Sequence, residues 1–224
     1  MKSLETVTVE TGPNPTFSII WMHGLGADGH DFEPLVPELL DKGLPVIRFV
    51  FPHAPVRPVT INNGYEMRAW YDIIGIDRRS AEDFEGINAS AQSITALIHR
   101  ENERGIPTNR ILVAGFSQGG AMALHIATRH PQTFAGVIAL SCYLPVAREL
   151  ATAHSPANLG TPIFMAHGSQ DPVVPLALGD FSREALEAAG YGVEWHTYPM
   201  QHGLCEPEVA ALRAWLKRVT VPAQ

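Results

Sequence analysis

Residues 111–120 read ILVAGFSQGG, and they decide the fold. The first five form an uninterrupted apolar run, which a strand buried on both faces of a sheet requires. The rest matches the pattern G-x-S-x-G, with Ser117 between Gly115 and Gly119. A strand that enters this pattern and a helix that leaves it predict a tight turn, which lifts the serine hydroxyl above the sheet edge. Both glycines are expected to be required, because a side chain would clash in so tight a bend.

Outward from this stretch, strands and helices alternate along the chain. Short apolar or alternating runs predict strands, and apolar residues spaced three or four apart predict helices. The strands are expected at residues 6–10, 17–22, 46–51, 111–115, 136–140, 162–166 and 193–198, and the helices at residues 31–41, 89–104, 118–130, 181–189 and 208–219. This alternation is typical of an α/β fold in which helices cover both faces of a mostly parallel central sheet. We see no internal repeat or linker in the sequence and predict one domain, residues 1–224.

The connection from Pro52 to Ser80 does not fit this alternation. It is rich in proline, asparagine and glycine, and it carries Tyr65, Trp70 and Tyr71. Long connections without secondary structure in compact domains are usually functional or mobile. The segment is either a surface excursion packed by its own aromatic side chains or a loop that roofs a binding groove, and we favour the loop.

The composition narrows the class of partner. The chain of 224 residues carries a net charge of -7 and no basic run, which argues against a nucleic-acid partner and against attachment to anionic lipid. No apolar run approaches the roughly 20 residues of a membrane-spanning helix, and the first residues lack the apolar core of a signal peptide. Cys142 and Cys205 form no zinc-site spacing and are expected to be reduced. We therefore expect a cytoplasmic protein without membrane insertion.

A serine hydroxyl needs a neighbouring base before it attacks a carbonyl. Folds with this turn supply the partners in the chain order Ser, then Asp or Glu, then His. Among the later histidines, His202 fits best, because it lies in the loop between the last predicted strand and the last predicted helix. That position is the carboxyl edge of the sheet, where ligands bind in open α/β folds. His196, within the strand, stays as the alternative base.

The acid is expected in the loop that follows the predicted strand at 162–166. Asp171 lies there, and Pro172 stiffens the backbone behind it. An ionised aspartate would hold the imidazole of His202 in the correct tautomer and stabilise its cation. Asp180 is the alternative acid, although we expect it to cap a helix. We expect His167 to pack under the site.

Residues 21–29, WMHGLGADG, follow the predicted strand at 17–22 into a glycine-rich turn. Folds with this serine turn draw one oxyanion donor from such a loop and another from the residue after the nucleophile. We therefore expect the backbone N–H groups of Leu25 and Gln118 to form the oxyanion hole. His23 is interpreted as a structural residue of the loop.

The chain resembles the phospholipase/carboxylesterase family, which includes small carboxylesterases and acyl-protein thioesterases. The resemblance lies in six segments: HGLGAD at 23–28, FPHAP at 51–55, TINNGYEMRAWYDI at 60–73, GFSQGG at 115–120, HGSQD at 167–171 and YPMQH at 198–202. It implies the α/β-hydrolase fold, a triad of Ser117, Asp171 and His202, and the same two oxyanion donors. It further implies that Trp70 and Val173 lie along an acyl groove, that no metal or cofactor is needed, and that the protein pairs as a homodimer.

We therefore expect a serine esterase that cleaves carboxylic esters of short to medium acyl chains through an acyl-enzyme intermediate. Its partner would be a small-molecule ester or thioester. The first alternative is an acyl-protein thioesterase or a lysophospholipase. An amidase that uses the same triad and a non-catalytic binding protein on this fold are the others.

Overall fold

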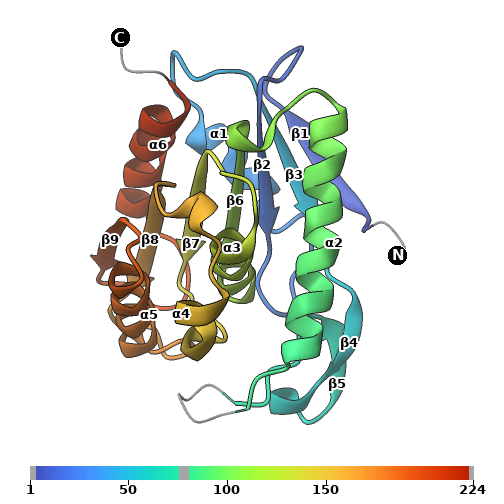
Figure 1. The fold of residues 1–224 in the computed structure, drawn as a ribbon, viewed down its shortest axis with the longest axis vertical. Helices are drawn as coiled ribbons and strands as arrows, with labels where there is room; N and C mark the ends of the chain where they lie inside the picture. The colour runs from blue at the N-terminus through green and yellow to red at the C-terminus, as the bar shows by residue number, and fades with distance from the viewer. Residues whose placement is uncertain (1–3, 76–80, 222–224) are drawn as a thin grey trace.

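The computed structural model describes residues 4–75 and 81–221. Its centre is a seven-stranded sheet with the strand order β1-β3-β2-β6-β7-β8-β9 (Figure 1). The strands are β1 (Thr6–Glu10), β2 (Phe17–Met22), β3 (Ile47–Pro52), β6 (Ile111–Phe116), β7 (Gly136–Leu140), β8 (Ile163–Gly168) and β9 (Val193–Tyr198). β1 pairs antiparallel with β3, whereas the remaining neighbours in this sheet are parallel. The mostly parallel sheet expected from the sequence is therefore confirmed.

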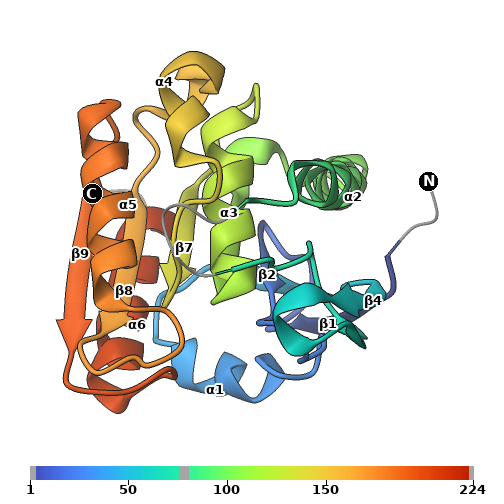
Figure 2. The ribbon, with the colours of Figure 1, turned by 90° about the horizontal axis from the view of Figure 1, so that it is seen from below.

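Helices cover both faces of this sheet (Figure 2). One face carries α2 (Phe84–Glu103), α3 (Gln118–Arg129), α4 (Leu150–Ala153) and α5 (Leu176–Ala188), and the other carries α1 (Val36–Leu39) and α6 (Glu206–Thr220). Successive side chains of each strand enter opposite cores: Ile20 belongs to the core under α2 and α3, and Ile19 to the core under α1 and α6. Among the residues described, no helix has the length and apolar character needed to cross a membrane.

Two helices begin about one turn earlier than the sequence predicts. The Asp83 side chain caps α2 by accepting a hydrogen bond from the Gly86 amide, so this helix starts at Phe84 rather than Ala89. α5 starts at Leu176 rather than Phe181. Asp180 therefore lies inside α5, and the expectation that it caps a helix start is wrong.

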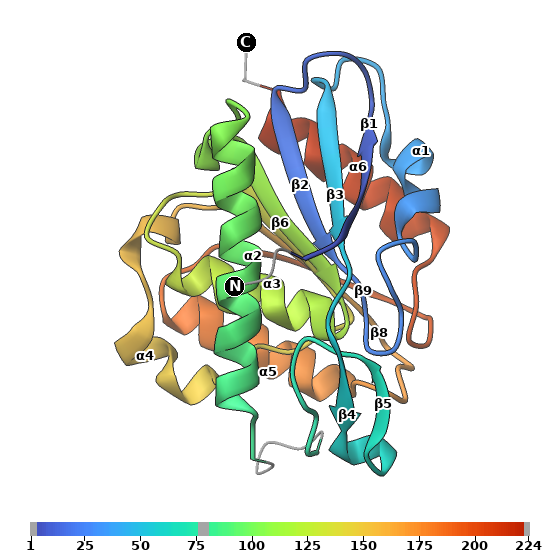
Figure 3. The same cartoon turned by 90° about the vertical axis from the view of Figure 1, so that its right-hand side faces the viewer.

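The segment after β3 forms a hairpin rather than an irregular loop. β4 (Val56–Val59) and β5 (Tyr65–Arg68) pair antiparallel, with a 3-10 turn (Thr60–Asn62) between them. The hairpin lies beyond the carboxyl end of β3, close to the start of α2 (Figure 3). The sequence predicts a connection without secondary structure here, because short strands with exposed polar residues lack the apolar run used to recognise a buried strand. Residues 76–80 of that predicted connection lie outside the described residues.

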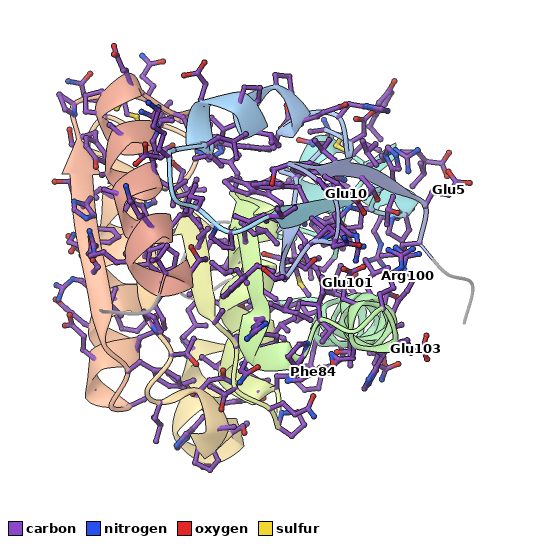
Figure 4. All side chains as sticks on the ribbon, turned by 90° about the horizontal axis from the view of Figure 1, so that it is seen from above. Glu5, Glu10, Phe84, Arg100, Glu101 and Glu103 are labelled. Atoms are coloured by element: carbon purple, nitrogen blue, oxygen red, sulfur yellow. The ribbon has the colours of Figure 1, made fainter. Side chains whose placement is uncertain are left out.

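A buried carboxylate joins α2 to the edge of the sheet. The Glu101 side chain is fully buried and accepts hydrogen bonds from Arg48 on β3 (2.9 Å) and Arg104 (2.9 Å). Arg48 also pairs with Glu10 on β1 at 2.8 Å. Figure 4, which views the molecule from above, shows Glu101 and Arg100 on the side of α2 that faces β1. This network fixes the helix that precedes β6, and β6 leads directly to Ser117.

Candidate active site

Ser117 occupies the sharp turn between β6 and α3. Its backbone angles are φ 53° and ψ -120°, a left-handed conformation that is unusual for a residue with a side chain. The turn is held by a hydrogen bond from the Ser117 amide to the Leu140 carbonyl (2.8 Å). A Cβ atom on Gly115 would lie 2.2 Å from Gly119 backbone atoms, and one on Gly119 would lie 2.1 Å from the Met22 carbonyl oxygen. The expected requirement for glycine at both positions is confirmed.

Asp171 and His202 contact each other as expected. His202 Nδ1 lies 2.7 Å from Asp171 Oδ2. The other oxygen, Oδ1, accepts hydrogen bonds from the backbone amides of Val173 (2.8 Å) and Val174 (2.9 Å). These two amides fix the rotation of the carboxylate, so Oδ2 is presented to the imidazole. A buried carboxylate in this position can orient the ring and stabilise its cation.

The His202 ring lies beside the nucleophile turn. Its centroid is 4.7 Å from the centroid of the Phe116 ring, and Phe116 directly precedes Ser117. The alternative base, His196, lies on β9 and contacts Glu194 at 3.0 Å, within the same strand. The alternative acid, Asp180, is 3.5 Å from Arg183 on α5. The structure therefore brings Ser117, Asp171 and His202 to one edge of the sheet and gives the two alternatives other partners.

His167 lies directly behind the carboxylate. It is fully buried, its Nε2 is 2.8 Å from the Val174 carbonyl oxygen, and it is 3.6 Å from Asp171 Oδ2. Burial lowers the pKa of His167, which favours the neutral ring. Its packing under the site agrees with the expectation from the sequence.

The loop after β2 approaches Ser117 from the opposite side. A Cβ atom placed on Gly24 would lie 3.5 Å from Ser117 Cβ, so the loop leaves room for no more than a small side chain beside the serine. Gly26 has φ 79°, and its amide donates to the Arg68 carbonyl (2.9 Å). Gln118 is the first residue of α3, so its amide has no acceptor inside the helix. The amides of Leu25 and Gln118 thus belong to two segments that meet at Ser117.

His23 is buried at the base of this loop. Its Nδ1 is 2.7 Å from the Gly24 carbonyl oxygen, and its Nε2 accepts a hydrogen bond from the Ala54 amide (3.1 Å). Because Nε2 accepts, the neutral ring carries its proton on Nδ1 and donates it to Gly24. Burial lowers the pKa of His23 to about 4, so this tautomer persists at neutral pH.

The Gln118 side chain has a role that sequence reasoning missed. It is buried, its Oε1 accepts from the Trp70 amide (2.8 Å), and its Nε2 donates to the Tyr71 carbonyl (2.7 Å). The two partners are more than 45 residues away in the chain. The sequence did contain a signal for this role. It places a glutamine at the first turn of a helix expected to be buried, and a buried side-chain amide needs hydrogen-bond partners.

Trp70 lies in a different place from the one implied by the resemblance. Its side chain is 0% exposed, its Nε1 donates to the His23 carbonyl (2.9 Å), and its ring packs 5.2 Å from the His23 ring. In this conformation Trp70 offers no surface to an acyl chain and instead supports the loop that carries Leu25. Val173 is 46% exposed and lies two residues from Asp171, so its place along an acyl groove stays a prediction.

The described residues contain no group of three or more His, Cys, Asp or Glu side chains that could hold a metal ion. Cys142 and Cys205 are both free thiols, the first buried and the second half-buried. The polar groups described above at this edge of the sheet are a serine hydroxyl, an imidazole, a carboxylate and backbone amides.

Comparison with known proteins identifies the family to which this chain is similar. Residues 5–220 match the family model described as Phospholipase/Carboxylesterase. Acyl-protein thioesterase 1 of Mycosarcoma maydis is 39% identical over 241 aligned positions that cover 100% of both chains. Acyl-protein thioesterase 1 of Neurospora crassa is 41% identical over 210 positions, which cover 90% of this chain and 86% of the relative.

Solved structures of related proteins have the same fold as this chain. Acyl-protein thioesterase 2 of Zea mays superposes with a TM-score of 0.86 at 30% identity, over 96% of this chain and 99% of that one. SOBER1 of Arabidopsis thaliana superposes with a TM-score of 0.85 at 29% identity, over 91% and 98% of the two chains. With the family match and a serine turn of this geometry, the chain belongs to the phospholipase/carboxylesterase family of α/β-hydrolases and is a serine hydrolase of carboxylic esters or thioesters.

Proposed function

We propose that this enzyme removes acyl groups from cysteine thioesters of proteins. The names of its relatives support this substrate class, and they agree better with it than with the short- and medium-chain carboxylic esters expected first. The assignment of Ser117, His202 and Asp171 as the triad belongs to the same proposal. One observation supports the triad: His202 Nδ1 lies 2.7 Å from Asp171 Oδ2 while the His202 ring packs against Phe116, next to the serine.

The mechanism proceeds by two displacements at the acyl carbon. His202 Nε2 takes the proton from Ser117 Oγ as this oxygen attacks the thioester carbonyl. The tetrahedral oxyanion accepts hydrogen bonds from the amides of Leu25 and Gln118, and the C–S bond then breaks. The proton on His202 passes to the departing thiolate. A water molecule, deprotonated by His202, attacks the acyl-enzyme, and the fatty acid leaves as Ser117 regains its proton.

A matched pair of substrates tests the proposal. One peptide carries an S-acyl cysteine and its partner carries an O-acyl serine in the same sequence, with acyl chains of 4, 8 and 16 carbons. Each kcat/KM is divided by the rate constant of the same bond with hydroxide, which removes the difference in intrinsic reactivity. We expect the thioester peptides to exceed their ester partners by at least about tenfold, which corresponds to about 1.4 kcal/mol of transition-state discrimination.

The other outcomes identify the alternatives. Equal normalised values with a preference for the 4-carbon chain would indicate a general carboxylesterase. Faster hydrolysis of a lysophospholipid than of any acyl peptide would indicate a lysophospholipase, and turnover of matched amides would indicate an amidase. Absence of labelling by a fluorophosphonate would indicate a binding protein on this fold.

A further inference from the structure

The backbone peptide between Gly24 and Leu25 is held by a side chain on its buried side. We infer that His23 is a positioning residue, which aims the Leu25 N–H at the oxyanion by fixing the Gly24 carbonyl. In a planar trans peptide, the C=O and the following N–H point in opposite directions. A hydrogen bond that draws the Gly24 oxygen toward the buried His23 ring therefore turns the Leu25 N–H away from the ring. The inference rests on the proposed role of Leu25 as an oxyanion donor.

The proton that makes this hydrogen bond is itself fixed. Nε2 of His23 accepts from the Ala54 amide at 3.1 Å, so the neutral ring must carry its hydrogen on Nδ1, 2.7 Å from the Gly24 oxygen. Ala54 is held in turn, because its carbonyl accepts from Arg68 Nη1 at 2.8 Å. The Ala54 amide thus determines the tautomer of neutral His23, and this assignment follows from the hydrogen bonds without any change in protonation.

The surroundings leave the peptide little freedom except rotation. On one side, the space beside Gly24 is bounded by Phe116 and Ser117, which would lie 3.3 Å and 3.5 Å from a Cβ atom built on Gly24. On the other, the Gly26 amide donates to the Arg68 carbonyl, and the Ala27 amide reaches the Gly24 oxygen only at 3.3 Å. The ring of His23 is 2% exposed and packs on Trp70, so the donor cannot move to another acceptor. Without the Nδ1 proton, rotation of the Gly24–Leu25 peptide is opposed chiefly by that long Ala27 contact.

Two substitutions separate the donor from the acceptor. In His23→Asn, Nδ2 is two bonds from Cβ, as Nδ1 is in histidine, so the donor to Gly24 is kept. In His23→Gln, Oε1 is three bonds from Cβ, as Nε2 is, so the acceptor for Ala54 is kept and the donor is lost. Using p-nitrophenyl butyrate, we expect His23→Gln to lower kcat about 10²-fold with KM changed less than about threefold, because one oxyanion donor is misaligned. We expect His23→Asn to lose less than about tenfold.

A transition-state analogue distinguishes positioning from loss of structure. An aliphatic trifluoromethyl ketone forms a tetrahedral adduct whose oxyanion occupies the hole, so its inhibition constant should rise by the same factor as kcat/KM falls. His130→Gln is the matched control, because His130 is also buried and its Nδ1 also lies near a backbone carbonyl, that of Gln132 at 3.1 Å, away from the site. We expect this control to keep kcat and the inhibition constant within twofold.

The outcomes are decisive in either direction. Equal losses in His23→Asn and His23→Gln, or an inhibition constant that stays constant while kcat falls, would overturn the inference. So would a fall in kcat that tracks the melting temperature in all three variants. Failure of the thioester proposal would leave this test intact, because p-nitrophenyl butyrate is an ester and reports only on the hydrolytic site.

Discussion

The two flanks of the active site hold their polar groups in different ways. The catalytic flank, formed by β8, β9 and the start of α6, contributes Asp171 and His202, the acid and the base of the proposed triad. The supporting flank, formed by the loop that follows β2 (residues 23–27), residues 53–75 and Gln118, contributes backbone amides and carbonyls. On the supporting flank, the buried side chains of His23, Trp70 and Gln118 are hydrogen-bonded at each of their polar atoms.

Pairing is less complete on the catalytic flank. Glu208, at the start of α6, is 0% exposed, and neither of its carboxylate oxygens has a hydrogen-bond partner of good geometry among the described residues, although the Cys205 amide favours the ionised form. His167 Nδ1 is also buried without a partner in the part of the chain that the structure describes. Among the described residues, unpaired buried polar atoms thus lie behind the proposed acid and base, whereas the side chains that hold the loop carrying Leu25 are hydrogen-bonded.

The largest expected effect is on the nucleophile, which both flanks serve. Ser117→Ala should lower kcat by about 10⁶-fold, because the acyl-enzyme cannot form and only binding and the oxyanion amides remain. Steady-state hydrolysis of p-nitrophenyl butyrate checks this, with far-UV circular dichroism to verify folding. A variant that keeps a tenth of the wild-type rate would remove Ser117 from the mechanism.

The second-largest effect is expected on the catalytic flank, at Asp171. In Asp171→Asn, the Val173 and Val174 amides still require an acceptor, so the Asn oxygen should face them and its NH₂ should face His202. That arrangement forces the wrong tautomer on the imidazole, and we expect kcat to fall by about 10⁴-fold. Asp180→Asn, which alters an ion-paired residue of α5, serves as the control and should keep the wild-type rate. Similar rates for the two variants would show that Asp171 does not orient the base.

The supporting flank should respond in stability more than in chemistry. Gln118→Met keeps the volume but leaves the Trp70 amide and the Tyr71 carbonyl buried without partners, at about 2 kcal/mol each. We expect the free energy of unfolding in urea to fall by about 4 kcal/mol, and kcat to fall less than about 10²-fold because the backbone amide of residue 118 remains. Gln92→Met, on the exposed side of α2, is the control. A loss of kcat as large as that of Asp171→Asn would erase the contrast between the flanks.

The smallest expected effect is the pH response of Glu208. Burial raises the pKa of Glu208 from 4.5 to about 7, so the folded protein keeps a proton that the unfolded chain loses above pH 4.5. The stabilisation is therefore complete below pH 4.5 and is lost as the pH rises through about 7, by up to about 3 kcal/mol. Urea unfolding at pH 5 and pH 8 should show this fall in the wild type and not in Glu208→Gln.

Glu206→Gln, an exposed change in the same helical turn, is the control for Glu208 and should keep the wild-type pH response. If Glu208→Gln loses stability between pH 5 and pH 8 as the wild type does, the unpaired carboxylate does not titrate in this range. The unpaired Glu208 carboxylate would then make no pH-dependent contribution to stability.

The sequence predicts those strands and helices whose pattern of apolar and polar residues matches their burial in the fold. Uninterrupted apolar runs predict the buried parallel strands, and the alternation of residues 6–10 predicts the antiparallel edge strand β1. All seven strands of the main sheet were therefore predicted within two residues at each end. The hairpin Val56–Arg68 was missed because its short strands are largely exposed and carry polar residues. The first turns of α2 and α5 were also missed: α2 begins at Phe84 behind the Asp83 cap, and α5 begins at Leu176 without a side-chain cap.

In the candidate site, too, some residues could be predicted from local sequence patterns and others could not. Ser117, Asp171 and His202 could be predicted because each follows a recognisable strand, and parallel strands deliver their carboxyl ends to one edge. The buried positions of Trp70 and of the Gln118 side chain depend on contacts between segments 48 residues apart in the chain. Such pairings follow from tertiary packing and leave no periodic trace in the sequence. The catalytic roles of the triad stay predictions until the variants above are measured.

The backbone at Ser117 has a consequence for attempts to improve this enzyme. A residue with a side chain held at φ 53° and ψ -120° destabilises the fold by about 1–3 kcal/mol, and glycine would relieve most of that strain. The same exchange deletes the hydroxyl. Selection for heat resistance alone would therefore enrich inactive descendants at this position, so a thermostability screen needs a turnover assay in every round.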